Sequence, residues 1–222
     1  MTEEFLTDAE QVEEVKRLFK EYAPVILLGV VLGGGGYFGW GYYKNYMTGR
    51  AIKAAEEFNL MGLALQTNDT KKARSIGEGI IKDYSSLPYA DQARLTLARI
   101  AVEEGHDADA VAPLTEVMNS SKDSELKQIA RLRLSRVLID QGKPDEALNL
   151  LDVAQAGSFV GRYHQVRGDA LLAKKDATGA INEYKIALSS AADGGVDGSL
   201  IEMKLADLGA NGEAPTTPKV KP

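Results

Sequence analysis

The chain has 222 residues, of which 44% are hydrophobic and 26% are charged, and its formal net charge is −6. This composition suits a globular domain and excludes both a wholly disordered chain and a protein with many membrane spans. The net negative charge argues against a nucleic-acid-binding protein, which would need a basic surface.

Cysteine is absent and only two histidines are present. Disulfides, thiolate metal sites, cysteine nucleophiles and histidine-rich metal sites are therefore excluded. His106 falls in a predicted turn and His164 on a predicted helix, where histidine is more often a surface or hydrogen-bonded residue than a base. P-loop, GxSxG and EF-hand patterns are also missing. We expect no catalytic residue, no metal and no cofactor, and we predict that the chain is not an enzyme.

Residues 1–21 form an acidic segment before a long apolar run. Apolar residues recur in it at helical spacing, at Val12, Val15, Leu18 and Phe19. This spacing predicts an amphipathic helix with Thr7 or Asp8 as its N-cap. Such a helix either lies on a membrane or contacts a protein. Its acidic residues make anionic lipid a poor partner, which favours a protein contact.

Residues 22–43 contain no charged side chain. A helix of this length rises about 33 Å, enough to cross a hydrocarbon core of about 30 Å. Tyrosine, tryptophan and phenylalanine gather at the ends of the run, as expected at a membrane boundary. A cleavable signal peptide would have a short basic start and a shorter apolar stretch. The sequence therefore predicts a signal anchor that is not cleaved, with one transmembrane helix over 22–43.

The charges flanking this helix leave its orientation open. Three basic residues precede the run and three follow it, at Lys16, Arg17, Lys20, Lys44, Arg50 and Lys53. The positive-inside rule therefore gives equal counts. The close packing of the first three leans weakly towards a cytoplasmic N-terminus.

Glycines inside the predicted span form two small-xxx-small pairs, Gly29 with Gly33 and Gly35 with Gly39. Such pairs allow another helix to approach closely. We expect these four residues to pack against a transmembrane partner. The alternative is that they are tolerated in the span without a specific contact.

The remainder, residues 44–208, shows helical periodicity and a repeat. Aligned alanines occur at Ala73, Ala110, Ala147 and Ala180. Twelve residues before them lie Met61, Ala98, Ser135 and Gly168, and seven residues after them lie Ile80, Val117, Ala154 and Ala187. Small residues at such positions let two helices pack closely.

We therefore predict an all-α chain in which a tetratricopeptide-like solenoid of about four helix hairpins follows the transmembrane helix. A generic helical bundle is the alternative. Pro113 predicts a kink or a late start in the second helix of its hairpin. Residues 209–222 have little apolar content and are predicted to be a disordered tail.

In a stack of helix hairpins the first helices line a concave side, where peptides or partner helices dock. Six residues are predicted to project into this groove, namely Gln92, Arg99, Arg136, Arg162, Gln165 and Asp169. The alternative for each is an ordinary solvated position. The three arginines would suit acidic or carboxylate-bearing segments, because guanidinium groups bind carboxylates in bidentate fashion.

The N-terminal region resembles the YfgM-type ancillary subunit of the bacterial SecYEG translocon. The resemblance is carried by the QVEEVK element at residues 11–16 and by Gly39-Trp40 near the end of a glycine-rich span. Residues 132–152 and 167–184 are similar to the repeat region of that family. The tail departs from the shorter members of the family.

This resemblance implies a single-pass protein of the bacterial inner membrane, with its N-terminus in the cytoplasm and its repeats in the periplasm. It implies association with the SecYEG translocon and with a PpiD-like membrane-anchored chaperone during protein export. Unfolded or emerging polypeptides are further expected partners of the groove. The alternative function is a scaffold for cell-division or cell-wall-synthesis complexes in the envelope.

Overall fold

The computed structural model describes residues 8–191 and 195–210. Within these ranges the secondary structure is helical, with no strand, which confirms the predicted all-α class. The α-helices are α1 (Asp8–Gln66), α2 (Thr70–Asp83), α3 (Pro88–Glu103), α4 (Asp107–Ser120), α5 (Ser124–Asp140), α6 (Pro144–Leu150), α7 (Val160–Ala173), α8 (Ala177–Ser189) and α9 (Gly198–Asp207). Two short 3₁₀ helices, η1 (Val153–Gln155) and η2 (Gly157–Phe159), lie between α6 and α7. The chain forms two compact units, one ending at Lys53 and the other beginning at Ala54.

The first unit is the N-terminal part of α1. Among the described residues, α1 is the one helix that is long and apolar enough to cross a membrane, and its most apolar stretch is not buried by any part of the chain. The predicted span 22–43 lies wholly within it. The helix contains Pro24 and continues without interruption to Gln66, so its last turns also supply the first helix of the second unit.

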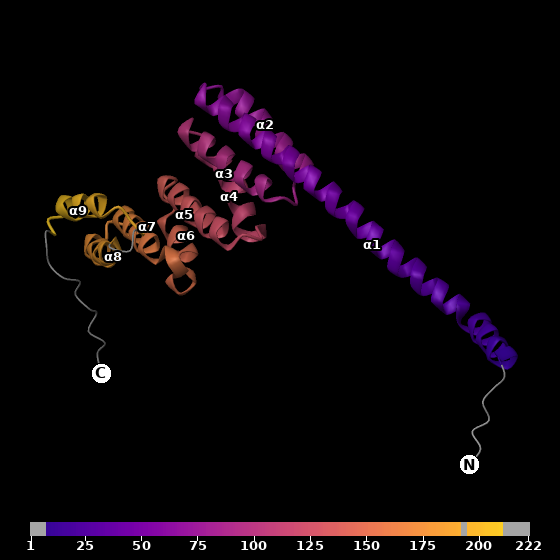
Figure 1. Cartoon of the computed structure of the whole chain (residues 1–222). Coiled ribbons are helices and arrows are strands. Elements are labelled where there is room, and N and C mark those ends of the chain that lie inside the picture. Colours follow the sequence, from indigo (N-terminus) through magenta and orange to yellow (C-terminus); the bar gives the residue numbers. More distant parts are fainter. Residues whose placement is uncertain (1–7, 192–194, 211–222) are drawn as a thin grey trace, which may run out of the picture. The chain divides into compact units, whose positions relative to one another are not determined.

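In the described residues the second unit is a stack of four helix hairpins, in agreement with the predicted helix-hairpin fold, while the bounds 44–208 of the repeat domain stay a prediction. The C-terminal turns of α1, from Ala54, pair with α2; the following pairs are α3 with α4, α5 with α6 and α7 with α8. Figure 1 shows the pairs following one another in chain order. The helix α9 packs on α8 through Ile201 and Leu205, and closes the last hairpin.

The repeated alanines define the helix contacts. Each of the four aligned alanines is 0% exposed, and Met61, Ala98, Ser135 and Gly168 opposite them are buried as well. The close approach is tightest at two glycines. A Cβ atom on Gly77 would lie 2.8 Å from Met61, and one on Gly168 would lie 2.5 Å from the ring of Tyr184. Glycine is therefore required at position 168, where the neighbour is a buried aromatic ring, whereas at position 77 the flexible end of the Met61 side chain can shift to make room.

The turns between the paired helices follow from their sequences. Gly142 takes a φ of 74°, which favours glycine, and Pro144 then begins α6 where its missing N–H has no partner to lose. Asp69 accepts a hydrogen bond from the backbone of Lys72, and Asp176 accepts one from Gly179. These carboxylates satisfy backbone N–H groups at the starts of α2 and α8.

Two details differ from the predictions. The repeat aligns Ala154 with Ile80, which is buried on α2. The helix α6 ends at Leu150, however, so Ala154 lies in η1, where it is exposed. The Asp152 carboxylate accepts a hydrogen bond from the Ala154 N–H, which stabilises the turn in place of further helix. The helix α4 begins at Asp107 and contains Pro113 in its interior, so the late start does not occur and the alternative, a kink at Pro113, stays a prediction.

The predicted disordered tail falls almost entirely outside the described residues, which end at Ala210. Of the possible N-caps for the first helix, Thr7 also lies outside them, and α1 begins at Asp8.

Candidate protein-binding site

Two neighbouring pockets open on the first helices of the hairpins. The first has a volume of about 250 Å³ and is lined by α1, α3 and α5, through Phe58, Met61, Gly62, Leu65, Thr96, Arg99 and Arg133. The second has a volume of about 310 Å³ and is lined by α3 and α5, with Leu114 of α4. Arg99 and Arg133 line both pockets. We name the two together the groove.

The second pocket combines an apolar floor with a charged rim. Its apolar lining is Ala98, Val102, Leu114 and Val137, and its charged lining is Arg99, Glu103, Arg133, Arg136 and Asp140. Val102 is 39% exposed, so part of this apolar lining is open to solvent. Apolar surface surrounded by a few charged groups is the ordinary chemistry of a peptide-binding site.

Four arginines form a basic strip along this side of the repeats, namely Arg99 on α3, Arg133 and Arg136 on α5, and Arg162 on α7. Their charges act on one another. Burial lowers the pKa of the Arg133 guanidinium, and the positive charges of Arg99 and Arg136 lower it further. Burial also lowers the pKa of Arg136; Asp169 opposes this and Arg162 adds to it.

Arginine stays protonated at every physiological pH, so the lowered pKa values of Arg133 and Arg136 mean no loss of charge. They reflect mainly the cost of burying a guanidinium and, to a smaller extent, the positive charges of neighbouring arginines. Part of each residue still reaches solvent. The partial ion pairing within the strip is weak: Arg99 Nε lies 3.6 Å from Glu103 Oε1, and both side chains are more than half exposed. A carboxylate arriving at the strip would relieve the mutual repulsion of the arginines and gain charge-assisted hydrogen bonds.

The structure brings some of the predicted groove residues together. Arg99 and Arg136 line the second pocket. Arg162 lies near enough to Arg136 to affect its pKa, and its Nε donates to the Gly195 carbonyl at 2.9 Å. Gln92 on α3 and Gln165 on α7 are half-buried and are not among the residues that line the two pockets.

Asp169 is held by internal partners. Its carboxylate accepts a hydrogen bond from Tyr184 Oη at 2.6 Å and forms an ion pair with Lys204 of α9. The same Lys204 lies over the Tyr184 ring. The Asp169 side chain therefore links α7 to α8 and α9. Its helix position predicted that it would face a partner, but these internal contacts give it a structural role.

Sequence reasoning missed Arg133. It donates from Nη1 to the Leu95 carbonyl at 3.2 Å and so ties α5 to α3 beneath the groove. The available signal was its spacing, because a residue three positions before Arg136 lies on the same face of a helix.

A second polar cluster joins α7 to α8. His164 Nδ1 and Glu183 Oε2 lie 2.6 Å apart, and Arg167 Nε donates to Glu183 Oε1 at 2.9 Å. Burial alone would raise the pKa of Glu183, but the hydrogen bonds from His164 and Arg167 outweigh it and lower that pKa below its ordinary value of 4.5. This cluster holds the helices of the fourth hairpin together.

A lowered carboxyl pKa makes stability depend on pH. The ionised Glu183 stabilises the fold above the unfolded pKa of about 4.5, and this contribution is lost as the pH falls through the lower folded value. We expect Glu183→Gln to destabilise the protein at neutral pH by roughly 1–3 kcal/mol and to show a smaller loss of stability on acidification than the wild type. Urea unfolding at a series of pH values measures this. The exposed Glu202→Gln is the matched control, and equal slopes for the wild type and Glu183→Gln would contradict the assignment.

The four glycines predicted to pack in a membrane all lie in α1. A Cβ atom on Gly29, Gly33 or Gly39 would meet nothing within 4 Å, so no described part of this chain covers these positions. Their packing against another transmembrane helix stays a prediction.

Comparison with known proteins extends over nearly the whole chain. The family model described as "Tetratricopeptide repeat-like domain" matches residues 16–210. A Haemophilus influenzae protein named "Ancillary SecYEG translocon subunit" is 29% identical over 206 residues, covering 93% of this chain and 97% of the relative. Proteins of the same name from Escherichia coli and Neisseria gonorrhoeae are 28% and 27% identical and cover 82% and 91% of this chain. No solved structure matches.

These matches agree with the resemblance found in the sequence, because the aligned region contains both the apolar part of α1 and the helix hairpins. None of the names describes an enzyme, in agreement with the prediction from the missing catalytic motifs. The four hairpins, the buried alanine register and the family model point to one conclusion: the chain belongs to the tetratricopeptide repeat-like domain family and is similar to the ancillary SecYEG translocon subunits.

Proposed function

We propose that this protein is a membrane-anchored ancillary subunit of the SecYEG translocon, whose repeats bind protein partners during export. The observation that carries the proposal is the alignment with relatives of that name over 93% of this chain, from the apolar helix through the repeats. A helix suited to membrane crossing followed by repeats with a charged, partly apolar groove is what such an adaptor requires.

The proposed topology is that of the family resemblance. Residues 22–43 cross the bacterial inner membrane once, the N-terminus is cytoplasmic and the repeats are periplasmic. In this arrangement the groove can meet a PpiD-like membrane-anchored chaperone or polypeptides leaving the translocon. The flanking basic residues are equal in number on the two sides and so do not oppose it.

We propose that the groove takes acidic segments. Its rim carries Arg99, Arg133 and Arg136, whose charges repel one another, while its floor is apolar. A partner with a carboxylate next to an aliphatic side chain would satisfy both features.

Co-purification of the full-length protein from native membranes in mild detergent, followed by mass spectrometry, tests the proposal. We expect translocon subunits and a periplasmic chaperone to be recovered. A variant with leucine at Gly29, Gly33, Gly35 and Gly39 is expected to lose the translocon subunits if these glycines pack against them. A variant with leucine at Gly41 is the control, because Gly41 also lies in the span and meets nothing within 4 Å but belongs to neither pair and, at about 100° per residue, falls on the opposite side of the helix.

Each result has a defined meaning. Recovery of cell-division or wall-synthesis proteins without translocon subunits would overturn the proposal in favour of the envelope scaffold. Recovery of translocon subunits with all variants would keep the function and place the contact outside the glycine pairs.

A further inference from the structure

The N-terminal turns of α1 carry an apolar face that no described part of the chain covers. Val15 is 63% exposed and Phe19 is 69% exposed, and Val12, Leu18 and Tyr22 are also exposed. At about 100° per residue, these five side chains fall within an arc of about 120° on one face of the helix. Glu13, Arg17 and Lys20 lie on the opposite side. Residues 12–22, which we name the interfacial segment, are therefore amphipathic.

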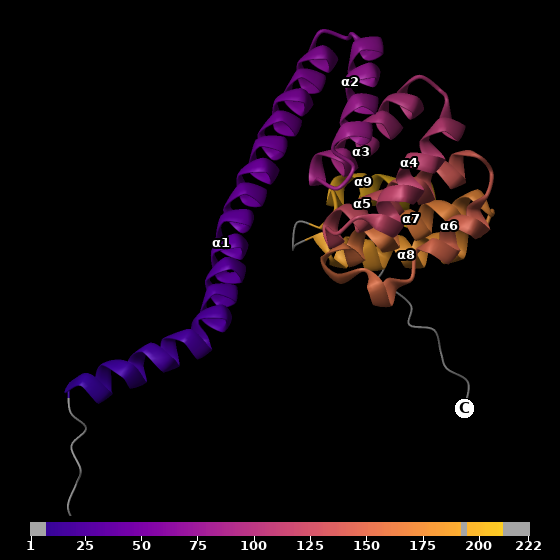
Figure 2. The same ribbon diagram turned by 90° about the vertical axis from the view of Figure 1, so that its right-hand side faces the viewer.

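Pro24 lies at the start of the predicted span 22–43, just after the interfacial segment. Pro24 has no N–H, so it cannot donate to the carbonyl of Lys20, and prolines inside helices cause kinks. Figure 2 shows that the N-terminal part of α1 departs from the direction of the rest of the helix. An unpaired carbonyl needs water, which the hydrocarbon core lacks. The change of direction therefore belongs at the membrane boundary and not within the bilayer.

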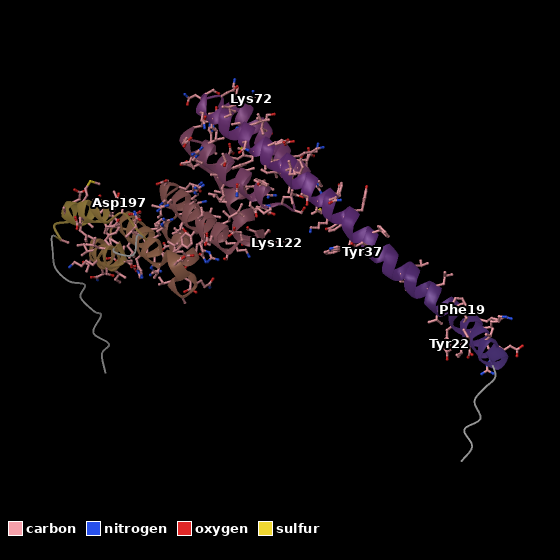
Figure 3. All side chains as sticks on the ribbon, viewed as in Figure 1. Phe19, Tyr22, Tyr37, Lys72, Lys122 and Asp197 are labelled. Atoms are coloured by element: carbon pink, nitrogen blue, oxygen red, sulfur yellow. The ribbon has the colours of Figure 1, made fainter. Side chains whose placement is uncertain are left out.

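We infer that the interfacial segment lies on the surface of the same bilayer that its anchor crosses, with Val12, Val15, Leu18, Phe19 and Tyr22 among the lipid headgroups and upper acyl chains. We infer that lipid covers this apolar face because the face is continuous along the chain with the apolar span that enters the same bilayer. Figure 3 shows Phe19 and Tyr22 projecting from this end of α1, and aromatic rings favour that depth. The inference rests on the anchoring that is part of the proposed function.

The charged residues of the interfacial segment indicate which kind of lipid surface it binds. The interfacial segment contains three acidic residues, Glu13, Glu14 and Glu21, and three basic residues, Lys16, Arg17 and Lys20. With no net charge, it gains little from anionic headgroups, and its docking depends on apolar contact. This revises the expectation of a protein contact, which rested on the poor fit to anionic lipid: a surface bound through apolar side chains needs no anionic lipid.

The chain contains no cysteine, so single cysteines can report the position of each residue. The full-length protein is reconstituted in vesicles of phosphatidylcholine, alone or mixed with phosphatidylglycerol. Spin labels are placed at Val15→Cys, Phe19→Cys, Glu13→Cys and Arg17→Cys, with Leu28→Cys as the reference inside the anchor. Collisions with oxygen, which concentrates in lipid, are compared with collisions with a water-soluble nickel chelate.

We expect the ratio of oxygen to nickel collisions to be severalfold higher at residues 15 and 19 than at residues 13 and 17, and highest at residue 28. Anionic lipid should leave this pattern unchanged. Adding Phe19→Glu should lower the ratio at residue 15, while Arg17→Glu, on the polar face, should not. Residues 17 and 19 lie outside the predicted span 22–43, so neither substitution changes the sequence of the span.

Three results would overturn the inference. Equal nickel access at residues 15 and 13 would place the segment in water. Protection of residues 15 and 19 from both reagents would show a protein contact. Water access at residue 28 would contradict the transmembrane anchor as well, and with it the proposed function. The first two results would contradict only the inference and leave the anchor unchallenged.

Discussion

Replacing Gly168 by leucine is expected to destabilise the protein by about 3 kcal/mol or more and to unfold its C-terminal hairpin first. A Cβ atom alone at this position would lie 2.5 Å from the Tyr184 ring and 3.0 Å from its Cζ, and a leucine adds three more carbon atoms. The ring is fully buried, so it cannot move aside without disturbing the apolar cluster in which it packs.

The damage extends beyond one contact. Tyr184 donates to Asp169, and Asp169 also pairs with Lys204 of α9. Displacing the ring therefore breaks the polar link between α7, α8 and α9 and exposes the apolar cluster that includes Ile201 and Leu205. Because a domain is stable by only about 5–15 kcal/mol, the loss is large.

Urea unfolding followed by circular dichroism measures the total effect, and hydrogen–deuterium exchange of α7–α9 shows where it occurs. Gly79→Ala is the matched control. Gly79 also lies inside a helix, but a Cβ atom there meets nothing within 4 Å, so alanine should stabilise the protein by up to about 1 kcal/mol. Additive effects in Gly168→Leu combined with Tyr184→Ala would contradict the steric explanation, since removing the ring should relieve the clash.

The second large effect is expected at the groove. Replacing Arg99 and Arg136 together by glutamate should weaken binding of an acidic partner segment at least about tenfold, because hydrogen bonds to charged groups are worth about 1.5–3 kcal/mol each. The substitution also introduces repulsion where the wild type attracts.

Titration of the purified full-length protein with the partner recovered by co-purification measures this binding. The control is Lys71→Glu with Lys72→Glu, which changes the net charge equally on exposed residues of α2; Figure 3 shows Lys72 on that helix. Unchanged binding by the arginine variant, or an equal loss in the lysine control, would show that the arginine strip does not recognise the partner. Unfolding curves matching the wild type would confirm that the fold is intact.

The helix hairpins were predictable because their register is local. Aligned small residues and turn residues mark each pair, and the buried alanines Ala73, Ala110, Ala147 and Ala180 lie where the repeat placed them. The early end of α6 was not predictable from this repeat, because it depends on Leu151 and Ala156 filling the space against Tyr163 of the next hairpin. The repeat pattern does not show that residues after the end of α6 pack in the place of a further helical turn.

The candidate site was only partly predictable for a similar reason. Arg99 and Arg136, which helix position predicted to face the groove, both line the second pocket, and their contact with a partner stays a prediction. Helix position could not show that Asp169 would be taken by Tyr184 and Lys204, since Lys204 comes from α9, a helix outside the repeat. Asp197, which accepts hydrogen bonds from the backbone of Ser199 and Leu200, was the sequence signal for that helix.

The order of the helix contacts has a consequence for how the protein is made. The principal contacts join helices that are neighbours along the chain, both within a hairpin, as for α7 with α8, and between one hairpin and the next, as for α4 with α5. Contacts between sequence neighbours form quickly and require no distant segment to be present. Each hairpin can therefore close on its predecessor during synthesis, and α9 completes the domain last. Nascent chains truncated after α4 or α6 should already contain the earlier hairpins in their final form.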